Sequence, residues 1–496
     1  MFAKPLSQPI QVLGCLAFGG DLSMGQPIDH SPRTALLANR ILMELGYGPD
    51  VASRAGALSL IRWAGCTANA QGFAELFGDD IACRAAIIEN RNPLTGKGQL
   101  SGPLDLYLRP LAMAQCEATI EMVKQLGLSP DIGAGASDLF EHWNGSGIPA
   151  GKKHEDVNLL AQVVSLASDT EILSRVFGLA KALHTIESRG GTHYDSALAR
   201  VAEKHAPIWL SELSQIDAWS EAAFSAESAL VSDETSPDSL VCLLADYADL
   251  KVPRHFQVSR KVSEMAAIVT SMLGLHSETA LRIRRAALLH GLGRVAVPNG
   301  TLEKEGMLTE ADNEYMRLIP YWTDRILKRA PDFETEAVLA AQAFERLDGT
   351  GFPKGLKGRS LSEEARVLQS CVFVATSWHD QNCRGAKDLD AVQRRITAEV
   401  TAGRLDKHCT DAALAACGMR KAPSLRTQSM ALHITDRERE VLVCLARGLT
   451  NKEIARALSI SPSTAGTHVE NLYRKLEVST RAAAALAALR LDLVDI

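Results

Sequence analysis

Residues 449–476 read LTNKEIARALSISPSTAGTHVENLYRKL, and this stretch decides the fold of the C-terminal part of the chain. Thr450 followed by Glu453 is a capping box, which predicts the start of a short helix. Ser461 and Pro462 predict an N-cap and a first-turn proline for the next helix. The apolar residues of that second helix recur at spacings of four, three and four, and they are Ala465, Val469, Leu472 and Leu476. The pattern therefore predicts two short helices joined by a tight turn.

The flanking residues extend this pair to a four-helix unit. Thr435 followed by Glu438 is another capping box, and Gly448 predicts the end of the helix that it opens. A fourth helix is predicted from about Thr480 to Leu491. A helix-turn-helix of this kind places the later of its two helices in the major groove of DNA.

The predicted DNA-contacting residues lie outside the apolar stripe of that helix or near the capped helix starts. Those expected to face the bases are Ser463, Gly466, Thr467, Glu470 and Arg474. Those expected near the phosphates are Thr450, Asn451, Lys452, Thr464, His468 and Lys475.

Residues 432–491 resemble the LuxR-type helix-turn-helix domain. The matching residues are Leu-Thr-Asn-Lys-Glu-Ile-Ala at 449–455, Ser-Pro-Ser-Thr at 461–464, His468, and Lys-Leu at 475–476. The resemblance implies that 463–476 is the recognition helix and that 480–491 mediates dimerisation, so we expect a homodimer on operator DNA. Family members often carry basic residues where this chain has Gly466 and Glu470, which predicts weaker or effector-dependent DNA binding. A module that only contacts proteins is the alternative.

Two earlier parts of the chain repeat each other. Residues 140–149 (FEHWNGSGIP) match 344–353 (FERLDGTGFP) at an offset of 204, and 60–65 match 288–293 at an offset of 228, so one copy carries an insertion. A repeat of this length predicts a duplicated domain. Ser, Asp and Glu are frequent between Ser225 and Ser239, which indicates a linker.

We therefore expect three domains and an all-α fold. Abundant Ala and Leu with only 5% aromatic residues favour helices. The expected boundaries are 1–225 and 226–419 for the two copies, 420–431 for a second linker, and 432–496 for the helix-turn-helix domain.

Both copies resemble the HD-GYP branch of the HD phosphohydrolase superfamily. In the second copy, residues 286–294 match the helix of the His-Asp dyad and 345–353 match the Gly-Tyr-Pro loop; the first copy matches at 30–33 and 141–149. The resemblance implies helical domains that bind two or three metal ions and, in active members, hydrolyse cyclic di-GMP.

Most of the metal ligands implied by this resemblance are replaced. His290 survives in the second copy and His30 in the first, and we expect both vestigial histidines to be buried structural residues. The other ligand positions of the second copy hold Val258, Gly291, Ile319, Ala343, Phe344 and Thr376. Those of the first copy hold Arg62, Trp63, Leu139 and Phe140. One neutral imidazole does not hold a metal pair, so we expect no metal site, no cofactor and no catalytic residues.

Two further features of these copies contain the residue types of functional motifs but are interpreted as structural. The His379-Asp380 dipeptide does not match the dyad helix, and we interpret it as an exposed helix end. The glycine-rich loops at 145–151 and 349–358 are predicted to be tight turns rather than phosphate cradles.

Charge, cysteine pattern and hydropathy exclude several classes of protein. A net charge of -6 confines any DNA contact to a local surface. The ten cysteines include no pair at the spacing that chelates zinc. The N-terminal stretch lacks the features of a signal peptide, and no apolar run is long enough for a membrane span, so we expect a cytoplasmic protein without membrane contact.

The sequence favours a transcriptional regulator whose two HD-GYP-like domains are inactive and serve in sensing or dimerisation. A nucleotide or another small molecule is the expected effector. The alternatives are a metal-dependent cyclic-dinucleotide phosphodiesterase, which would hold near-stoichiometric metal, and a scaffold protein, whose residues 1–419 would capture a partner.

Overall fold

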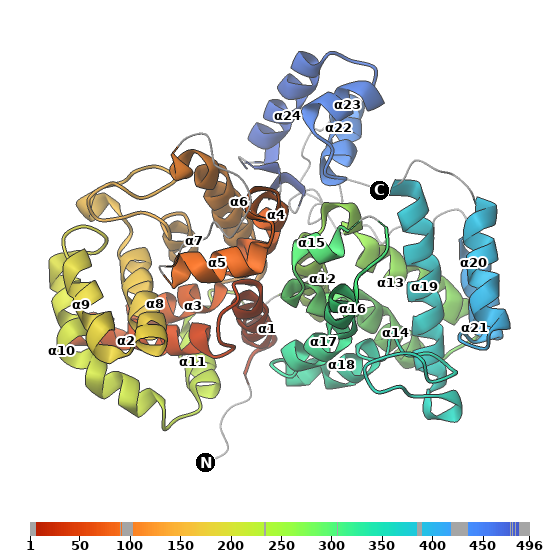
Figure 1. The fold of residues 1–496 in the computed structure, drawn as a ribbon, viewed down its shortest axis with the longest axis horizontal. Helices are drawn as coiled ribbons and strands as arrows, with labels where there is room; N and C mark the ends of the chain where they lie inside the picture. Colours follow the sequence, from red (N-terminus) through yellow and green to blue (C-terminus); the bar gives the residue numbers. More distant parts are fainter. Residues whose placement is uncertain are drawn as a thin grey trace. The chain divides into compact units, whose positions relative to one another are not determined.

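The computed structural model describes residues 6–89, 91, 103–232, 235–304, 306–383, 389–417, 435–476, 478, 480–481 and 483–485. These residues form helices and turns with three isolated β-bridges and no β-strand, which confirms the all-α expectation (Figure 1). The expected linker at 420–431 and most of the predicted fourth helix lie outside the described residues. No described helix is long and apolar enough to cross a lipid bilayer.

The chain packs as two compact units, 1–240 with 298–300, and 241–297 with 301–496. The helices of the first unit are α1 (Gln8–Ser23), α2 (His30–Glu44), α3 (Pro49–Ile61), η1 (Ala64–Asn69), α4 (Ala70–Phe77), α5 (Asp80–Ile88), α6 (Leu104–Gln125), α7 (Pro130–Ala136), η2 (His154–Asp156), α8 (Leu159–Phe177), α9 (Leu179–Arg189), α10 (Ser196–Leu213), α11 (Ala218–Ala226) and η3 (Glu227–Ala229). The division between the units falls within α12 (Pro237–Asp249).

The helices of the second unit follow the same order, and three further helices, α22, α23 and α24, come after them. They are η4 (Pro253–His255), α13 (Val258–Met272), α14 (Ser277–Leu289), η5 (Leu292–Ala296), α15 (Asn299–Leu302), α16 (Glu310–Arg317), α17 (Ile319–Leu327), η6 (Pro331–Phe333), α18 (Glu334–Ala340), η7 (Gly358–Ser360), α19 (Glu363–Cys383), α20 (Leu389–Thr401), α21 (Lys407–Ala416), α22 (Asp436–Ala446), α23 (Asn451–Ala457) and α24 (Pro462–Leu476).

The structure repeats itself at the two offsets found in the sequence. Helices α2 and α3 have the same bounds as α13 and α14 at the larger offset, whereas α7 has the same bounds as α18 at the smaller one. In each unit the first of these helices packs on the second and on a long later helix, α2 on α3 and α8, and α13 on α14 and α19. The offset changes between η1 and α7, so the insertion of the first copy lies in the region that contains α4, α5 and the start of α6.

One pair of glycines shows why the two copies keep the same register. A Cβ atom on Gly65 would lie 2.0 Å from the carbonyl oxygen of Gln115, and one on Gly293 would lie 2.0 Å from that of Ile319. The two glycines correspond at the larger offset, and the two carbonyls correspond at the smaller one. Only glycine allows η1 to approach α6, and η5 to approach α17, this closely.

The prediction of a linker between Ser225 and Ser239 is wrong for the first part of this stretch. Helix α11 ends at Ala226 and η3 follows directly, with Ala226 and Ala229 fully buried against α3. Small alanine side chains at these positions let the segment pack into the first unit, which the polar composition of the stretch did not indicate. The expected domain boundaries themselves stay predictions.

Candidate nucleic-acid interface and the two duplicated centres

Helices α22, α23 and α24 form a small domain around its own apolar core. The buried side chains of this core are Val441, Leu442, Cys444, Leu445, Ile454, Ala455, Ala465, Val469, Leu472, Leu476 and Ala484. All four residues of the apolar stripe that the sequence predicted on α24 belong to this core. Burial of this stripe fixes which face of α24 points outward.

The helix starts of this domain are capped as the sequence predicted. Both capping boxes form, Thr435 with Glu438 at α22 and Thr450 with Glu453 at α23. The Ser461 hydroxyl accepts a hydrogen bond of 3.0 Å from the backbone N–H of Thr464 at the start of α24. The local pattern therefore determined all three helix starts.

The face of α24 opposite the core is open. Among the predicted DNA-contacting residues, the exposed ones are Thr450, Lys452, Ser463, Thr464, Thr467, Glu470 and Arg474. The half-buried ones are Asn451, Gly466, His468 and Lys475. Exposed polar side chains on a helix that rests on a firm core are the arrangement by which a recognition helix reads a groove. Their DNA contacts stay predictions.

Four of the predicted phosphate-contacting residues already have side-chain partners inside the domain: Thr450 and Thr464 at the helix starts, and Asn451 and Lys475. The Lys475 ammonium donates to the Glu438 carboxylate at 2.6 Å, and this hydrogen bond lowers the pKa of Glu438 to about 2. The Asn451 side-chain oxygen accepts a hydrogen bond of 2.9 Å from Arg481. Arg481, which the sequence did not single out, also donates to the carbonyl of Leu449, so it holds the turn before α23.

Replacing Thr450 with valine should weaken this domain without changing its core. The substitution removes the hydroxyl of the capping box, and we expect the domain to lose about 1 kcal/mol of unfolding free energy. Denaturant unfolding of the full chain, monitored by a probe placed in this domain, measures the loss. Thr467→Val makes the same isosteric change in the middle of α24 and should stay within about 0.5 kcal/mol of wild type; equal losses in both variants would contradict the capping role.

In the first unit, the vestigial histidine is part of a buried ion network. The ring of His30 contacts the Glu171 carboxylate at 2.6 Å through Nδ1 and the Ser168 hydroxyl at 3.2 Å through Nε2. Glu171 also accepts hydrogen bonds from Arg33, at 2.8 Å, and from Arg175. Burial raises the pKa of Glu171, but the hydrogen bond to His30 and the charge of Arg175 outweigh it and bring the pKa to about 2. Both ring nitrogens of His30 are thus engaged by protein groups.

A buried guanidinium lies at the dyad position of this unit. Arg62 is 1% exposed, donates to the Thr34 hydroxyl at 3.3 Å and lies over the ring of Trp63. Asp21 of the same unit is also fully buried, and its carboxylate accepts hydrogen bonds from the backbone and hydroxyl of Ser31 at 3.0 and 2.6 Å. Burial raises the pKa of Asp21 to about 6, against the opposing charges of His30 and Arg62.

In the second unit, His290 is fully buried and its ring also meets a guanidinium. Nδ1 of His290 donates to the carbonyl of Ala287 at 2.6 Å, and Nε2 accepts from Arg294 at 3.4 Å. Arg294 donates in turn to Asp249 at 3.2 Å. Burial and the charge of Arg294 lower the pKa of His290 to about 3, so its ring is neutral near pH 7. The Phe344 ring, at a former ligand position, lies 6.1 Å from the His290 ring between centroids.

The expectation that His379 ends a helix in solvent is wrong. His379 lies within α19, is half-buried, and contacts the carbonyl of Arg254 through Nε2 and the ammonium of Lys261 at 3.5 Å through Nδ1. Its ring centroid is 6.5 Å from that of His255. Burial and nearby positive charges, that of Arg294 first among them, hold the pKa of His255 well below its usual value. No local pattern pointed to His255, because its neighbours come from distant segments.

These side chains do not fit a metal pair. Among the described residues, no group of three or more His, Cys, Asp or Glu side chains is arranged to hold a metal ion. Each surviving histidine is hydrogen-bonded to protein groups, and Arg294 donates a hydrogen bond to the buried Asp249 of the second unit.

The two glycine-rich loops are folded around glutamates rather than open to a ligand. The Glu141 carboxylate accepts backbone hydrogen bonds from Ala150, Gly151 and Lys152 at 2.6 to 3.2 Å. Glu345, its counterpart at the smaller offset, accepts them from Lys354 and Leu356 at 2.8 and 2.9 Å. The amides that could have bound a phosphate therefore bind a carboxylate of the chain itself.

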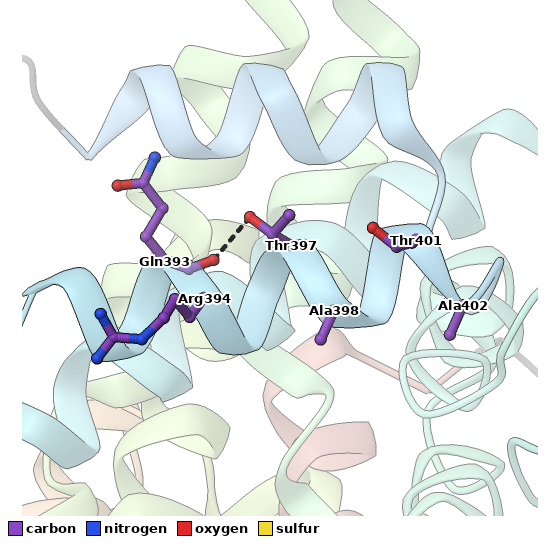
Figure 2. A pocket seen from close by; sticks show the side chains of 6 residues that line it. All are labelled: Gln393, Arg394, Thr397, Ala398, Thr401 and Ala402. Atoms are coloured by element: carbon purple, nitrogen blue, oxygen red, sulfur yellow. Dashed lines mark hydrogen bonds between the residues drawn. The ribbon is translucent and has the colours of Figure 1, made fainter.

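A shallow groove elsewhere in the second unit holds none of the predicted site residues. Figure 2 shows its lining, which comes from one face of α20 and the residue after it, namely Gln393, Arg394, Thr397, Ala398, Thr401 and Ala402. The Thr397 hydroxyl donates to the carbonyl of Gln393 at 2.8 Å, a bond within the helix. All six residues are exposed, so the groove is an open surface.

Family models assign both parts of the chain. Residues 109–198 and 242–388 match the HD domain, and residues 432–488 match the bacterial regulatory proteins of the LuxR family. The chain thus contains HD-domain segments followed by a C-terminal LuxR-family helix-turn-helix domain, as both resemblances predicted.

Individual relatives agree with this division. The 3'3'-cGAMP-specific phosphodiesterase 3 of Vibrio cholerae is 27% identical over 398 residues, which cover 75% of this chain and 86% of that protein. A crystal structure of a cyclic GMP-AMP-specific phosphodiesterase from V. cholerae has the same fold, with a TM-score of 0.59 and 24% identity over 84% of this chain and 99% of that one. The putative transcriptional regulator YhjB of Escherichia coli is 53% identical over 53 residues, 11% of this chain and 26% of that regulator.

Proposed function

We propose that this protein is a transcriptional regulator that binds operator DNA as a homodimer through α24, while its two HD-type units no longer hydrolyse a substrate and serve in sensing or dimerisation. The observation that carries the proposal is the contrast between the two parts of the chain. The helix-turn-helix domain keeps its caps, its core and an open recognition face. In the HD-type units both surviving histidines are bonded to protein groups, and in the second unit the Arg294 guanidinium lies between Asp249 and His290.

The chemistry of the HD-type units supports the loss of hydrolysis. A metal-dependent phosphodiesterase needs cations that lower the pKa of a water molecule and neutralise the phosphate. A guanidinium supplies positive charge but has no coordination site for water, and its own pKa stays far above neutrality. His290 is neutral and buried, and His30 is bonded to Glu171, so neither is available as a ligand in this arrangement.

The test of DNA binding uses the purified full-length chain and fragments of its own genome. We expect it to retain a subset of fragments, and we expect the logarithm of the association constant to fall linearly with the logarithm of salt concentration, by about 0.9 per phosphate contact. Fluorescence anisotropy on a retained fragment measures the slope, and repeating it with candidate nucleotides tests for an effector. Absence of salt-sensitive binding under all of these conditions would overturn the regulator.

A metal-dependent cyclic-dinucleotide phosphodiesterase is the second candidate, because the 3'3'-cGAMP-specific phosphodiesterase 3 of V. cholerae matches 75% of the chain. The deciding measurements are the metal content of the purified chain and the turnover of 3'3'-cGAMP and cyclic di-GMP with added Mn²⁺ or Fe²⁺. We expect substoichiometric metal and no turnover above the buffer rate. Near-stoichiometric metal together with turnover would establish this candidate and refute inactivity.

A further inference from the structure

The guanidinium of Arg294 occupies the space of a missing side chain. A Cβ atom built on Gly291 would lie 2.7 Å from Nη1 of Arg294 and 2.9 Å from its Cζ. Gly291 stands where the HD dyad has its aspartate, and its φ of -94° and ψ of 0° are open to any residue. The glycine is therefore needed for the room that it leaves to the guanidinium.

The same guanidinium connects two groups that suit a metal ion. It lies between Asp249, at 3.2 Å, and Nε2 of His290, at 3.4 Å. Because Nδ1 of His290 donates to a backbone carbonyl, Nε2 carries the lone pair and points at the cation. A backbone carbonyl placed behind the ring in this way orients the histidine ligands of metals. The geometry is that of a cation site whose cation is a side chain.

The first unit keeps the corresponding buried aspartate without a corresponding arginine. Asp21 and Asp249 correspond at the larger offset, and each accepts hydrogen bonds from the backbone and hydroxyl of a corresponding serine. Arg294 corresponds to Cys66 of the first unit, and Arg62 of the first unit corresponds to His290. The ion pair between Arg294 and Asp249 therefore has no counterpart at the corresponding positions of the first unit.

We propose that Arg294 is the resident cation of the second duplicated centre, and that it excludes a divalent metal ion which Asp249, His290 and a restored aspartate at position 291 would otherwise bind. The inference rests on the proposed loss of metal-dependent hydrolysis in the second unit. It goes further by naming the residue that maintains the metal-free state.

A double-mutant cycle with Co²⁺ as the probe tests the inference. In the full chain, Gly291→Asp combined with Arg294→Ala removes the guanidinium and adds a carboxylate. We expect this variant to bind about one Co²⁺ per chain, seen as a visible absorption band, and its melting temperature to rise by about 3 °C or more at about 1 mM Co²⁺. Arg294→Ala alone should bind more weakly, because it offers one ligand fewer.

The variants that keep a cation, and the wild type, provide the controls. Wild type, Gly291→Asp and Arg294→Lys should show no Co²⁺ band attributable to this centre and no change in melting temperature on treatment with EDTA. Adding His290→Leu to the double variant should abolish its band, which separates this centre from adventitious binding by thiols. If the alanine variants do not fold, Arg294→Gln with Gly291→Asp retains more side-chain volume and carries the same expectation.

Two results would overturn the inference. The first is a wild-type chain whose melting temperature falls when EDTA removes a bound metal ion. The second is a folded double variant that takes up no more Co²⁺ than wild type. Hydrolysis of cyclic dinucleotides by the wild type is a separate readout, so failure of the proposed function and failure of this inference are distinguishable.

Discussion

The full chain carrying Ser463→Glu and Thr467→Glu should lose about a hundredfold in operator affinity, equivalent to about 2.8 kcal/mol. Both side chains are exposed on the face of α24 opposite its buried stripe, so the substitutions add two negative charges where the helix would meet DNA. Like charges placed against each other in an interface cost several kcal/mol. Fluorescence anisotropy at fixed salt concentration measures the loss.

The matched control is Ser463→Gln with Thr467→Gln, which adds similar volume without charge. We expect this variant to lose less affinity than the glutamate variant, and both variants to unfold at the same denaturant concentration as wild type, because Ala465, Val469 and Leu472 stay buried. Equal affinity of the glutamate variant and wild type would show that this face of α24 does not contact DNA.

Glu171→Gln should destabilise the first unit by about 3 kcal/mol at pH 7. The Glu171 side chain is fully buried, is hydrogen-bonded to His30 and pairs with Arg33 and Arg175. A neutral amide would leave Arg33 without this counter-charge and Arg175 with Asp29 alone. Thermal or denaturant unfolding of the full chain measures the change. Glu187→Gln, at an exposed position of α9, is the control and should change the free energy of unfolding by less than about 0.5 kcal/mol.

The lowered pKa of Glu171 also predicts how the destabilisation by Glu171→Gln changes with pH. The pKa of Glu171 is about 2 in the folded chain, below its ordinary value of 4.5. A lowered pKa of an acid stabilises the fold above the unfolded-state value, and the contribution is lost as pH falls toward the folded-state value. The difference between wild type and Glu171→Gln should therefore be full above about pH 5 and shrink toward pH 2. A difference that does not change with pH would mean that the loss comes from packing rather than from charge.

The sequence predicted those features that depend on neighbours along the chain. Capping boxes and first-turn prolines act within about four residues, so the starts of α22, α23 and α24 were predictable. The repeated motifs predicted the duplication, and the helix bounds follow the same offsets. The all-helical class followed from composition and periodicity.

Features that depend on distant partners were not predictable from local pattern. His30 and Glu171 are 141 residues apart, and nothing near either residue indicates the other. The surroundings of His379 come from α13 and from the segment before it, so its burial was missed. The segment after Ser225 is polar in composition, yet its alanines pack against α3.

Arg62 and Arg294 lie at different positions of the two copies, and this difference bears on the history of the duplication. A single substitution made before the duplication would have left arginine at corresponding positions in both copies. The two arginines instead derive from codons that are four places apart in the common register. The two buried guanidinium groups therefore do not descend from one arginine of the ancestral segment.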